Sequence, residues 1–105
     1  MIIKKEGVYL LLKQIPSGKV TTYKALANLL HTKGYRAIGQ IVKNNPFAPI
    51  VPCHRVVRSD GSLGGYMGQI SGPLIQKKKK LLLHEGVVCE GNKIRDFKKV
   101  FTDLK

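Results

Sequence analysis

The stretch TTYKALANLLHTKGYRAIGQIVKNNP, residues 21–46, decides the fold. Thr21 or Thr22 is suited to begin a helix, because a threonine hydroxyl can accept a hydrogen bond from the first helical turn. Apolar side chains then recur with the spacing of one helical face, at Tyr23, Leu26, Ala27 and Leu30. Gly34 ends this helix, and a second short helix is predicted from Tyr35 to about Lys43. Two short helices across a glycine-containing turn are typical of a helix-turn-helix.

The sequence on either side predicts further short elements around this helix pair. Helix-like apolar spacing in residues 7–14 is stopped by Pro16-Ser17-Gly18. Asn44-Asn45-Pro46 ends the second helix, and a series of prolines then holds an extended path into residues 53–57. Downstream we expect a turn at 59–61, a glycine-rich loop at 63–66, a helix from Pro73 to Gly86, a short strand at 87–89, and a last amphipathic helix marked by Ile94, Phe97, Phe101 and Leu104.

Length, composition and charge bound the class of protein. The chain has 105 residues, of which 43% are hydrophobic, enough for one domain with its own core. Lys and Arg number 19 against 6 Asp and Glu, and the net charge of +13 makes a polyanion the expected partner. Two cysteines exclude a secreted disulfide-rich scaffold. No apolar run approaches the ~20 residues of a membrane span, and the N-terminus lacks the pattern of a signal peptide. We therefore expect a reduced, soluble, cytoplasmic protein.

Cys53 and His54 are the residues best suited to chemistry. A thiolate is a strong nucleophile, but an unperturbed pKa of about 8.5 leaves only a few per cent of a thiol ionised at neutral pH. His54 is the obvious base, and a bridging water is the expected link because adjacent side chains point in different directions. Glu85, at a predicted helix end, is placed to fix the imidazole tautomer. For a bare Cys-His dipeptide, however, a buried small hydrophobe beside a satisfied core histidine is the more common arrangement.

A metal site is the rival use of these side chains. The ligands would have to come from Cys53, Cys89, His31, His54 and His84. No C-x-x-C or H-x-x-x-H pair exists among them, so we expect no metal.

The basic residues favour a nucleic-acid partner without placing its contacts. Arg36 opens the second helix, where recognition helices present their contacts, although a lone arginine is more often an ordinary surface residue. Residues 77–80 are four consecutive lysines, which we interpret as a solvated helix face. Tyr23 and Tyr66 have rings that can stack on a base, while the helical spacing of Tyr23 favours the core.

The chemistry-bearing stretches stand in a fixed order along the chain. Five motifs surround the core PCHRV at 52–56: IPSGKVTTY at 15–23, RAIG at 36–39, NP at 45–46, GSLGGY at 61–66 and LLLHEG at 81–86. This series strongly resembles the catalytic C-terminal domain of the O6-alkylguanine-DNA alkyltransferases (methylated-DNA–protein-cysteine S-methyltransferases) over roughly residues 8–88. The resemblance implies a mostly α (α+β) fold, a winged-helix or helix-turn-helix-like DNA-binding domain with short strands.

The resemblance also implies a role for each matching residue. Cys53 would accept the alkyl group, and His54 and Glu85 would form a water-linked relay that activates it. Asn45 would tie the helix-turn-helix to the active-site segment. Arg36 would enter the base stack and fill the gap left by a flipped nucleotide. Further contacts are implied with the substrate base for Tyr23, the main chain of Val56, Tyr66, Met67 and Lys78, and with DNA for Tyr35, Ala37 and Gly39.

The implied function is DNA repair by direct reversal on duplex DNA that carries O6-alkylguanine. The alkyl carbon is buried in a duplex, so the base must be extruded to reach Cys53. Binding mainly to backbone phosphates suits the charge of +13. A thioether is a poor leaving group, so the protein would act only once. The resemblance also implies a monomer that needs no cofactor.

The chain departs from the family pattern in three places. The usual N-terminal domain is expected to be absent, so that residues 1–105 form a single catalytic and DNA-binding domain. Residues 67–80 are several residues longer than usual, and residues 90–105 lie outside the match. The alternative function is that of an alkyltransferase-like protein, which binds lesions without transfer. Such proteins replace the cysteine, often by tryptophan, whereas this chain keeps Cys53 and has no tryptophan. A Cys-His hydrolase is disfavoured because no separate oxyanion-hole motif is evident.

Overall fold

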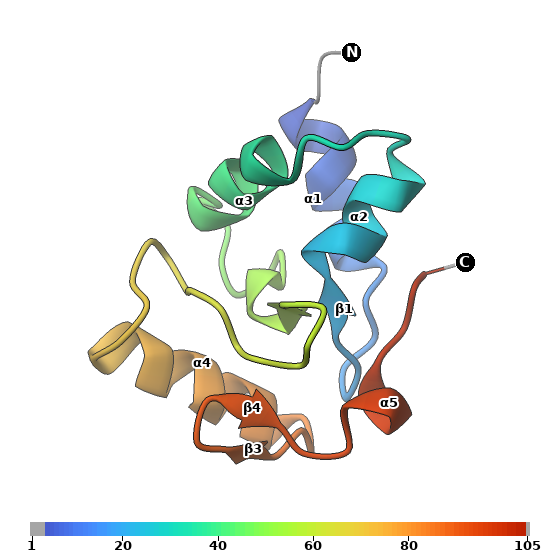
Figure 1. The fold of residues 1–105 in the computed structure, drawn as a ribbon. Coiled ribbons are helices and arrows are strands. Elements are labelled where there is room, and N and C mark those ends of the chain that lie inside the picture. The colour runs from blue at the N-terminus through green and yellow to red at the C-terminus, as the bar shows by residue number, and fades with distance from the viewer. Residues whose placement is uncertain (1–3, 105) are drawn as a thin grey trace.

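The computed structural model describes residues 4–104 of the chain. Two groups of elements lie on either side of a short parallel strand pair (Figure 1). One group holds the helices α1 (Lys5–Lys13), α2 (Tyr23–Leu29) and α3 (Tyr35–Lys43). The other holds α4 (Pro73–His84), the hairpin strands β3 (Cys89–Glu90) and β4 (Lys93–Ile94), and the short helix α5 (Phe97–Val100). The prediction of a mostly α fold with short strands is confirmed.

The strand pair between the two groups joins distant parts of the chain. β1 (Thr21–Thr22) lies parallel to β2 (Val56–Val57), with Thr21 opposite Val56. The 3₁₀ helix η1 (Cys53–Arg55) comes directly before β2. The pairing therefore fixes the PCHRV segment beside the start of α2.

The helix pair α2–α3 forms where the sequence predicts it. Thr22 Oγ1 accepts a hydrogen bond of 3.0 Å from the backbone N–H of Ala25 and so caps α2. All the main helices bury one face in a common core, which includes Val8, Leu12, Leu26, Ile38, Val56, Leu63 and Leu82. Removal of each such side chain from water contributes about 1.5–3 kcal/mol. Cys53 belongs to the same core, so the packing that holds α3 also holds the candidate nucleophile.

The C-terminal segment corrects the prediction of a long last helix. α5 has only four residues, and the apolar positions Ile94, Phe101 and Leu104 lie outside it. Backbone pairing explains the difference. The N–H of Val20 donates to the carbonyl of Val100, the last residue of α5, and the carbonyl of Val20 accepts from the N–H of Thr102, both at 2.8 Å. These bonds extend the chain where the apolar spacing alone predicts a helix.

Residues 46–52 also differ from the extended path that the prolines predict. Turns cover residues 46–50. Phe47 anchors them, because its N–H donates to Asn45 Oδ1 at 3.0 Å and its carbonyl accepts from the N–H of Val51 at 3.0 Å. Proline is compatible with turns as well as with extended chain, and the polar side chain of Asn45 decides between them here.

Two smaller points complete the fold. The strand predicted at residues 87–89 lies instead at Cys89–Glu90. Among residues 4–104, no helix has the length and apolar character needed to cross a bilayer.

Candidate active site

A cleft of about 420 Å³ lies between α3 and residues 65–70, and Cys53 is part of its lining. Tyr23 from the start of α2 and Arg36 from the first turn of α3 line the same cleft. Tyr66 and Met67 line it from the glycine-rich loop. The fold thus brings together predicted site residues from four distant parts of the sequence.

The thiol of Cys53 lies in a largely closed environment, with 2% of its residue surface exposed. Burial raises the pKa of this thiol, against a hydrogen bond from Asn45, the positive charge of Lys78 and a hydrogen bond from Tyr66, which lower it. The net rise keeps the resting side chain a thiol at neutral pH. A nearby group must therefore accept its proton before Sγ can attack.

His54, the next residue in the chain, is the candidate for that acceptor. Its Nε2 lies 3.2 Å from Glu85 Oε2. Burial opposes ionisation of Glu85, but hydrogen bonds from Arg55 and His54 hold the pKa of its carboxyl below the ordinary value. An ionised Glu85 accepts from Nε2–H, and this tautomer leaves the lone pair on Nδ1. That Nδ1 atom is buried and has no hydrogen-bond partner among residues 4–104. Burial lowers the pKa of His54 despite the nearby Glu85, so the ring is neutral at pH 7 and Nδ1 can take a proton.

Arg55 completes this network, and sequence reasoning does not single it out. Its Nε donates to Glu85 Oε1 at 2.9 Å, and its Nη2 contacts the other carboxylate oxygen. Its Nη1 donates to the carbonyl of Ile15 at 2.7 Å. A two-pronged arginine–carboxylate pair is strongly directional, so Arg55 orients Glu85 toward His54. Its place within the PCHRV core is the only sequence signal that points to it.

Asn45 links α3 to the segment that carries the cysteine. The residue is 1% exposed, and its Nδ2 donates to the carbonyl of Val51 at 2.7 Å. Its Oδ1 accepts from Phe47 at the other end of the turn. These bonds give the geometry that the implied tying role requires.

Lys78 corrects the interpretation of residues 77–80 as a solvated face. It is 0% exposed, whereas Lys77 and Lys80 are exposed and Lys79 is partly buried. It shares the buried side of α4 with Ile75 and Leu82, at the spacing of one helical face. The lysine run therefore contains one interior residue, which its neighbours of the same type conceal.

The ammonium group of Lys78 joins three backbone carbonyls. Its Nζ donates to Val56 at 2.9 Å, to Leu63 at 2.6 Å and to Gly65 at 2.9 Å. A lysine has three N–H donors, so all are used. The carbonyl of Val56, an implied substrate contact, already accepts one of these bonds. Lys78 does not line the cleft; it holds β2 and the glycine-rich loop together from behind.

The buried ammonium predicts that stability rises with pH. Burial lowers the pKa of Lys78 from 10.5 to about 7. Above pH 7 the unfolded chain keeps a proton that the folded chain has released, so the free energy of unfolding should rise by up to about 1.4 kcal/mol per pH unit. The window closes near pH 9, because an ordinary thiol in the unfolded chain then ionises, whereas burial raises the pKa of Cys53 and keeps the folded thiol protonated, which lowers the free energy of unfolding.

Urea titrations from pH 7 to 9 would measure this rise. Lys78→Met should flatten it, because that side chain has no proton to release. An equal rise in both proteins would show that another group is responsible.

A tight turn forms the far rim of the cleft. The N–H groups of Tyr66 and Gln69 donate to each other's carbonyls at 2.8 and 3.0 Å. Between them Met67 and Gly68 have φ values of 51° and 86°, and a type I′ hairpin turn needs positive φ at both positions. Gly68 lies against the end of α3, since a Cβ there would stand 3.1 Å from Lys43 Cε. The longer segment at residues 67–80 is thus a fixed turn followed by the start of α4.

The other residues predicted to contact DNA lie on or beside α3. Tyr35 is 46% exposed and Ala37 is exposed, while Gly39 lines the cleft. Arg58 also lines the cleft, and no pattern in the sequence singles it out. Among residues 4–104, no three His, Cys, Asp or Glu side chains gather in a way that would hold a metal ion.

The fold and the site together define a small, strongly basic, mostly helical domain with a candidate cysteine nucleophile. The family model "6-O-methylguanine DNA methyltransferase, DNA binding domain" matches residues 4–87. The chain belongs to this family.

Three relatives show how far the similarity extends. The methylated-DNA–protein-cysteine methyltransferase of Pyrobaculum aerophilum is 49% identical over 87 residues, which are 83% of this chain and 53% of that protein. The structure of Mycobacterium tuberculosis OGT in complex with DNA aligns with a TM-score of 0.69 at 37% identity, over 78% of this chain and 48% of that one. S. pombe Atl1 in complex with damaged DNA containing O6-carboxymethylguanine aligns with a TM-score of 0.79 at 26% identity, over 97% and 98%. The chain thus spans about half of the first two proteins and nearly all of the third.

Proposed function

We propose that this chain is a catalytic domain that repairs O6-alkylguanine in DNA by a single transfer of the alkyl group to Cys53. The observation that carries the proposal is the joint position of Cys53 and the buried, unpartnered Nδ1 of His54 beside a cleft. Glu85 fixes the histidine tautomer that this role needs. Relatives named methylated-DNA–protein-cysteine methyltransferase support the same reaction.

The proposed reaction moves one alkyl group and one proton. His54 Nδ1 takes the thiol proton of Cys53 through a bridging water, and Sγ attacks the alkyl carbon. An S–C bond forms as the C–O6 bond breaks, and the proton passes to the departing guanine. Neutral guanine remains in DNA, and a thioether remains on the protein. Nothing in the step calls for a cofactor.

The fold also supports the proposal that the damaged base is extruded. A base inside a duplex cannot reach a nucleophile that is 2% exposed. Arg36 stands at the cleft on the exposed start of α3, where it can enter the base stack. The small residues Ala37 and Gly39 let the same helix approach a duplex closely. Duplex DNA carrying O6-alkylguanine is therefore the proposed partner.

The alternative is a protein that binds O6-alkylguanine without transfer. The full-length alignment with S. pombe Atl1 favours it. The retained Cys53, with a proton acceptor beside it, favours transfer. A duplex with a labelled O6-methyl group separates the two: transfer moves the label to the protein, whereas lesion binding alone leaves it in DNA.

Arg36→Ala should separate extrusion from chemistry. We expect slower repair of duplex DNA and a much smaller defect with free O6-benzylguanine, because the free base needs no extrusion. Single-turnover rates on the two substrates give the comparison. Equal losses on both would assign Arg36 to the fold or to the chemical step instead.

Glu85→Gln should slow transfer without preventing DNA binding. The amide is neutral and fixes the tautomer of His54 less firmly, so the rate should fall about 10²-fold, the lower end of general-base effects. His54 titrates below its ordinary pKa, so the acid loss of activity should lie below pH 6.5 in the unmodified protein. An unchanged rate in the variant would remove Glu85 from the relay.

A further inference from the structure

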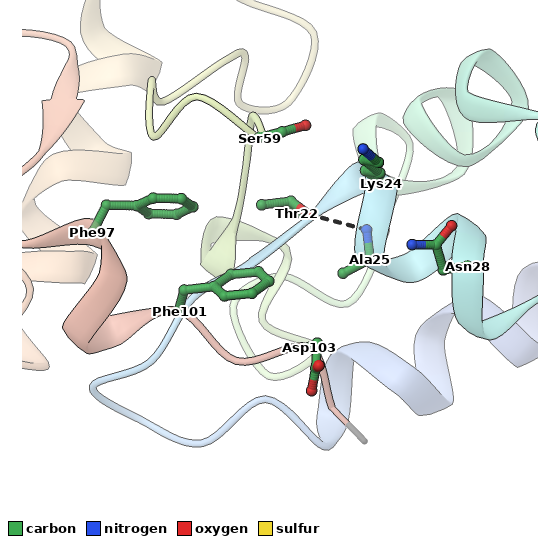
Figure 2. A pocket seen from close by; sticks show the side chains of 8 residues that line it. All are labelled: Thr22, Lys24, Ala25, Asn28, Ser59, Phe97, Phe101 and Asp103. Carbon is green, nitrogen blue, oxygen red and sulfur yellow. Dashed lines mark hydrogen bonds between the residues drawn. The ribbon is translucent and has the colours of Figure 1, made fainter.

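We propose that the pocket between α2 and the C-terminal segment binds a nucleotide of the damaged strand that neighbours the extruded one. This inference rests on the proposed function. The pocket has a volume of about 320 Å³ and is distinct from the Cys53 cleft. Figure 2 shows the rings of Phe97 and Phe101 directed toward α2, which presents Lys24 and Asn28.

The aromatic wall of this pocket is held in place. The ring centroids of Phe97 and Phe101 lie 5.5 Å apart, with 45° between the ring planes. Phe97 packs on Gly61, where a Cβ would stand 3.3 Å from its Cγ. Phe101 lies between the two backbone bonds that tie the C-terminal segment to Val20. Phe101 nevertheless keeps 36% of its surface exposed, so a fixed aromatic face is available to a ligand.

The opposite wall supplies polar groups suited to a nucleotide. Lys24, Asn28 and Ser59 are exposed and form no side-chain hydrogen bond or ion pair within residues 4–104. The Thr22 hydroxyl is already committed to the cap of α2. Asp103 lies at the other end of the pocket in Figure 2, away from Ser59. A phosphate would therefore sit near Lys24 and Ser59, away from that carboxylate.

A continuous path connects this pocket with the Cys53 cleft. A third cleft of about 570 Å³ shares Tyr23 and Arg58 with the Cys53 cleft and shares Lys24 and Ser59 with the aromatic pocket. A DNA strand whose damaged base enters the Cys53 cleft would pass the cationic side chains of Arg58 and Lys24 on its way to Phe101.

The mixture of groups points to a nucleotide rather than to a purely apolar ligand. A cationic track with aromatic faces is the usual way to hold an unpaired or splayed nucleotide, because every base has a π-face. Phe97 and Phe101 lie beyond residues 4–87, the part that the family model matches. The pocket is thus built partly by residues outside the part of the chain that the family model matches.

Two substitutions test the two walls separately. Phe101→Ala should weaken binding to a lesion-bearing duplex about tenfold, within the range seen when stacking on one base is lost, and leave the salt dependence unchanged. Lys24→Gln should make the slope of log K against log salt shallower by about 0.9, the value for one phosphate contact. The matched controls are Phe47→Ala and Lys13→Gln, which lie together in another groove and should change neither quantity.

Transfer from free O6-benzylguanine keeps this test independent of the proposed function. Both variants should react with the free base at the unmodified rate, because neither residue lines the Cys53 cleft. If the unmodified protein removes no benzyl group from free O6-benzylguanine, the proposed function is refuted. Normal transfer with unchanged duplex affinity in Phe101→Ala would refute only the nucleotide pocket.

Shortened duplexes distinguish direct contact from an indirect effect of Phe101. The lesion is moved stepwise toward one end of the duplex and then toward the other. The affinity difference between Phe101→Ala and the unmodified protein should vanish as the strand is shortened on one side only. A difference that survives shortening on both sides would overturn the proposal.

Discussion

Cys53→Ala should abolish alkyl transfer and retain binding to lesion-bearing DNA. The substitution removes the only cysteine among the residues that line the cleft. It removes little surface from the DNA-binding face, since Cys53 is 2% exposed. We expect no detectable transfer from an O6-methylguanine duplex and a dissociation constant close to that of the unmodified protein. Single-turnover transfer and a binding titration on the same duplex measure the two quantities.

Cys89→Ala is the matched control for this loss. Cys89 is the other cysteine, partly buried at the start of β3 and outside the cleft. The Cys89→Ala protein should accept the alkyl group at the unmodified rate. Transfer that survives in Cys53→Ala, with the adduct on Cys89, would contradict the assignment of the nucleophile.

Of the proposed substitutions, Lys78→Met should lower the free energy of unfolding the most. Methionine keeps the length and helix propensity of the side chain but donates no hydrogen bond. The carbonyls of Val56, Leu63 and Gly65 would lose the donor they share. Each unsatisfied buried group costs about 1–3 kcal/mol, so the free energy of unfolding should fall by about 3 kcal/mol or more. Urea denaturation at pH 7 measures it.

Lys77→Met is the matched control, one residue away on the exposed side of α4. Its effect on the free energy of unfolding should stay within about 0.5 kcal/mol, as for an ordinary surface position. Equal effects at the two positions would mean that the three carbonyl bonds add nothing to stability. Where Lys78→Met folds, slower transfer would show that the glycine-rich loop has lost its position.

The elements that sequence predicts well are those with local causes. Helices α2 and α3 follow from apolar spacing, the Thr22 cap and Gly34, all within a short stretch. The prediction of a long last helix is wrong because backbone pairing with Val20, a residue far away in sequence, competes with the helix that the apolar spacing favours. The turns at residues 46–50 likewise depend on the side chain of Asn45, and composition alone does not reveal this dependence.

The candidate site is predicted where a motif marks the residue and is missed where packing alone selects it. The resemblance carried by the PCHRV and LLLHEG motifs implies a relay of His54 and Glu85, and the structure places these side chains in contact. The burial of Lys78 is different, because nothing within four consecutive lysines says which one faces the core. Packing of α4 against β2 and the glycine-rich loop makes that choice.

Intact mass spectrometry of the protein after incubation with excess O6-methylguanine duplex tests the central claim most directly. The account predicts one added methyl group per chain, located on the peptide that carries Cys53, with one guanine restored for each protein consumed. A second addition of duplex should give no further product. An unmodified chain that binds the lesion tightly, or more product than protein, would contradict single transfer to Cys53.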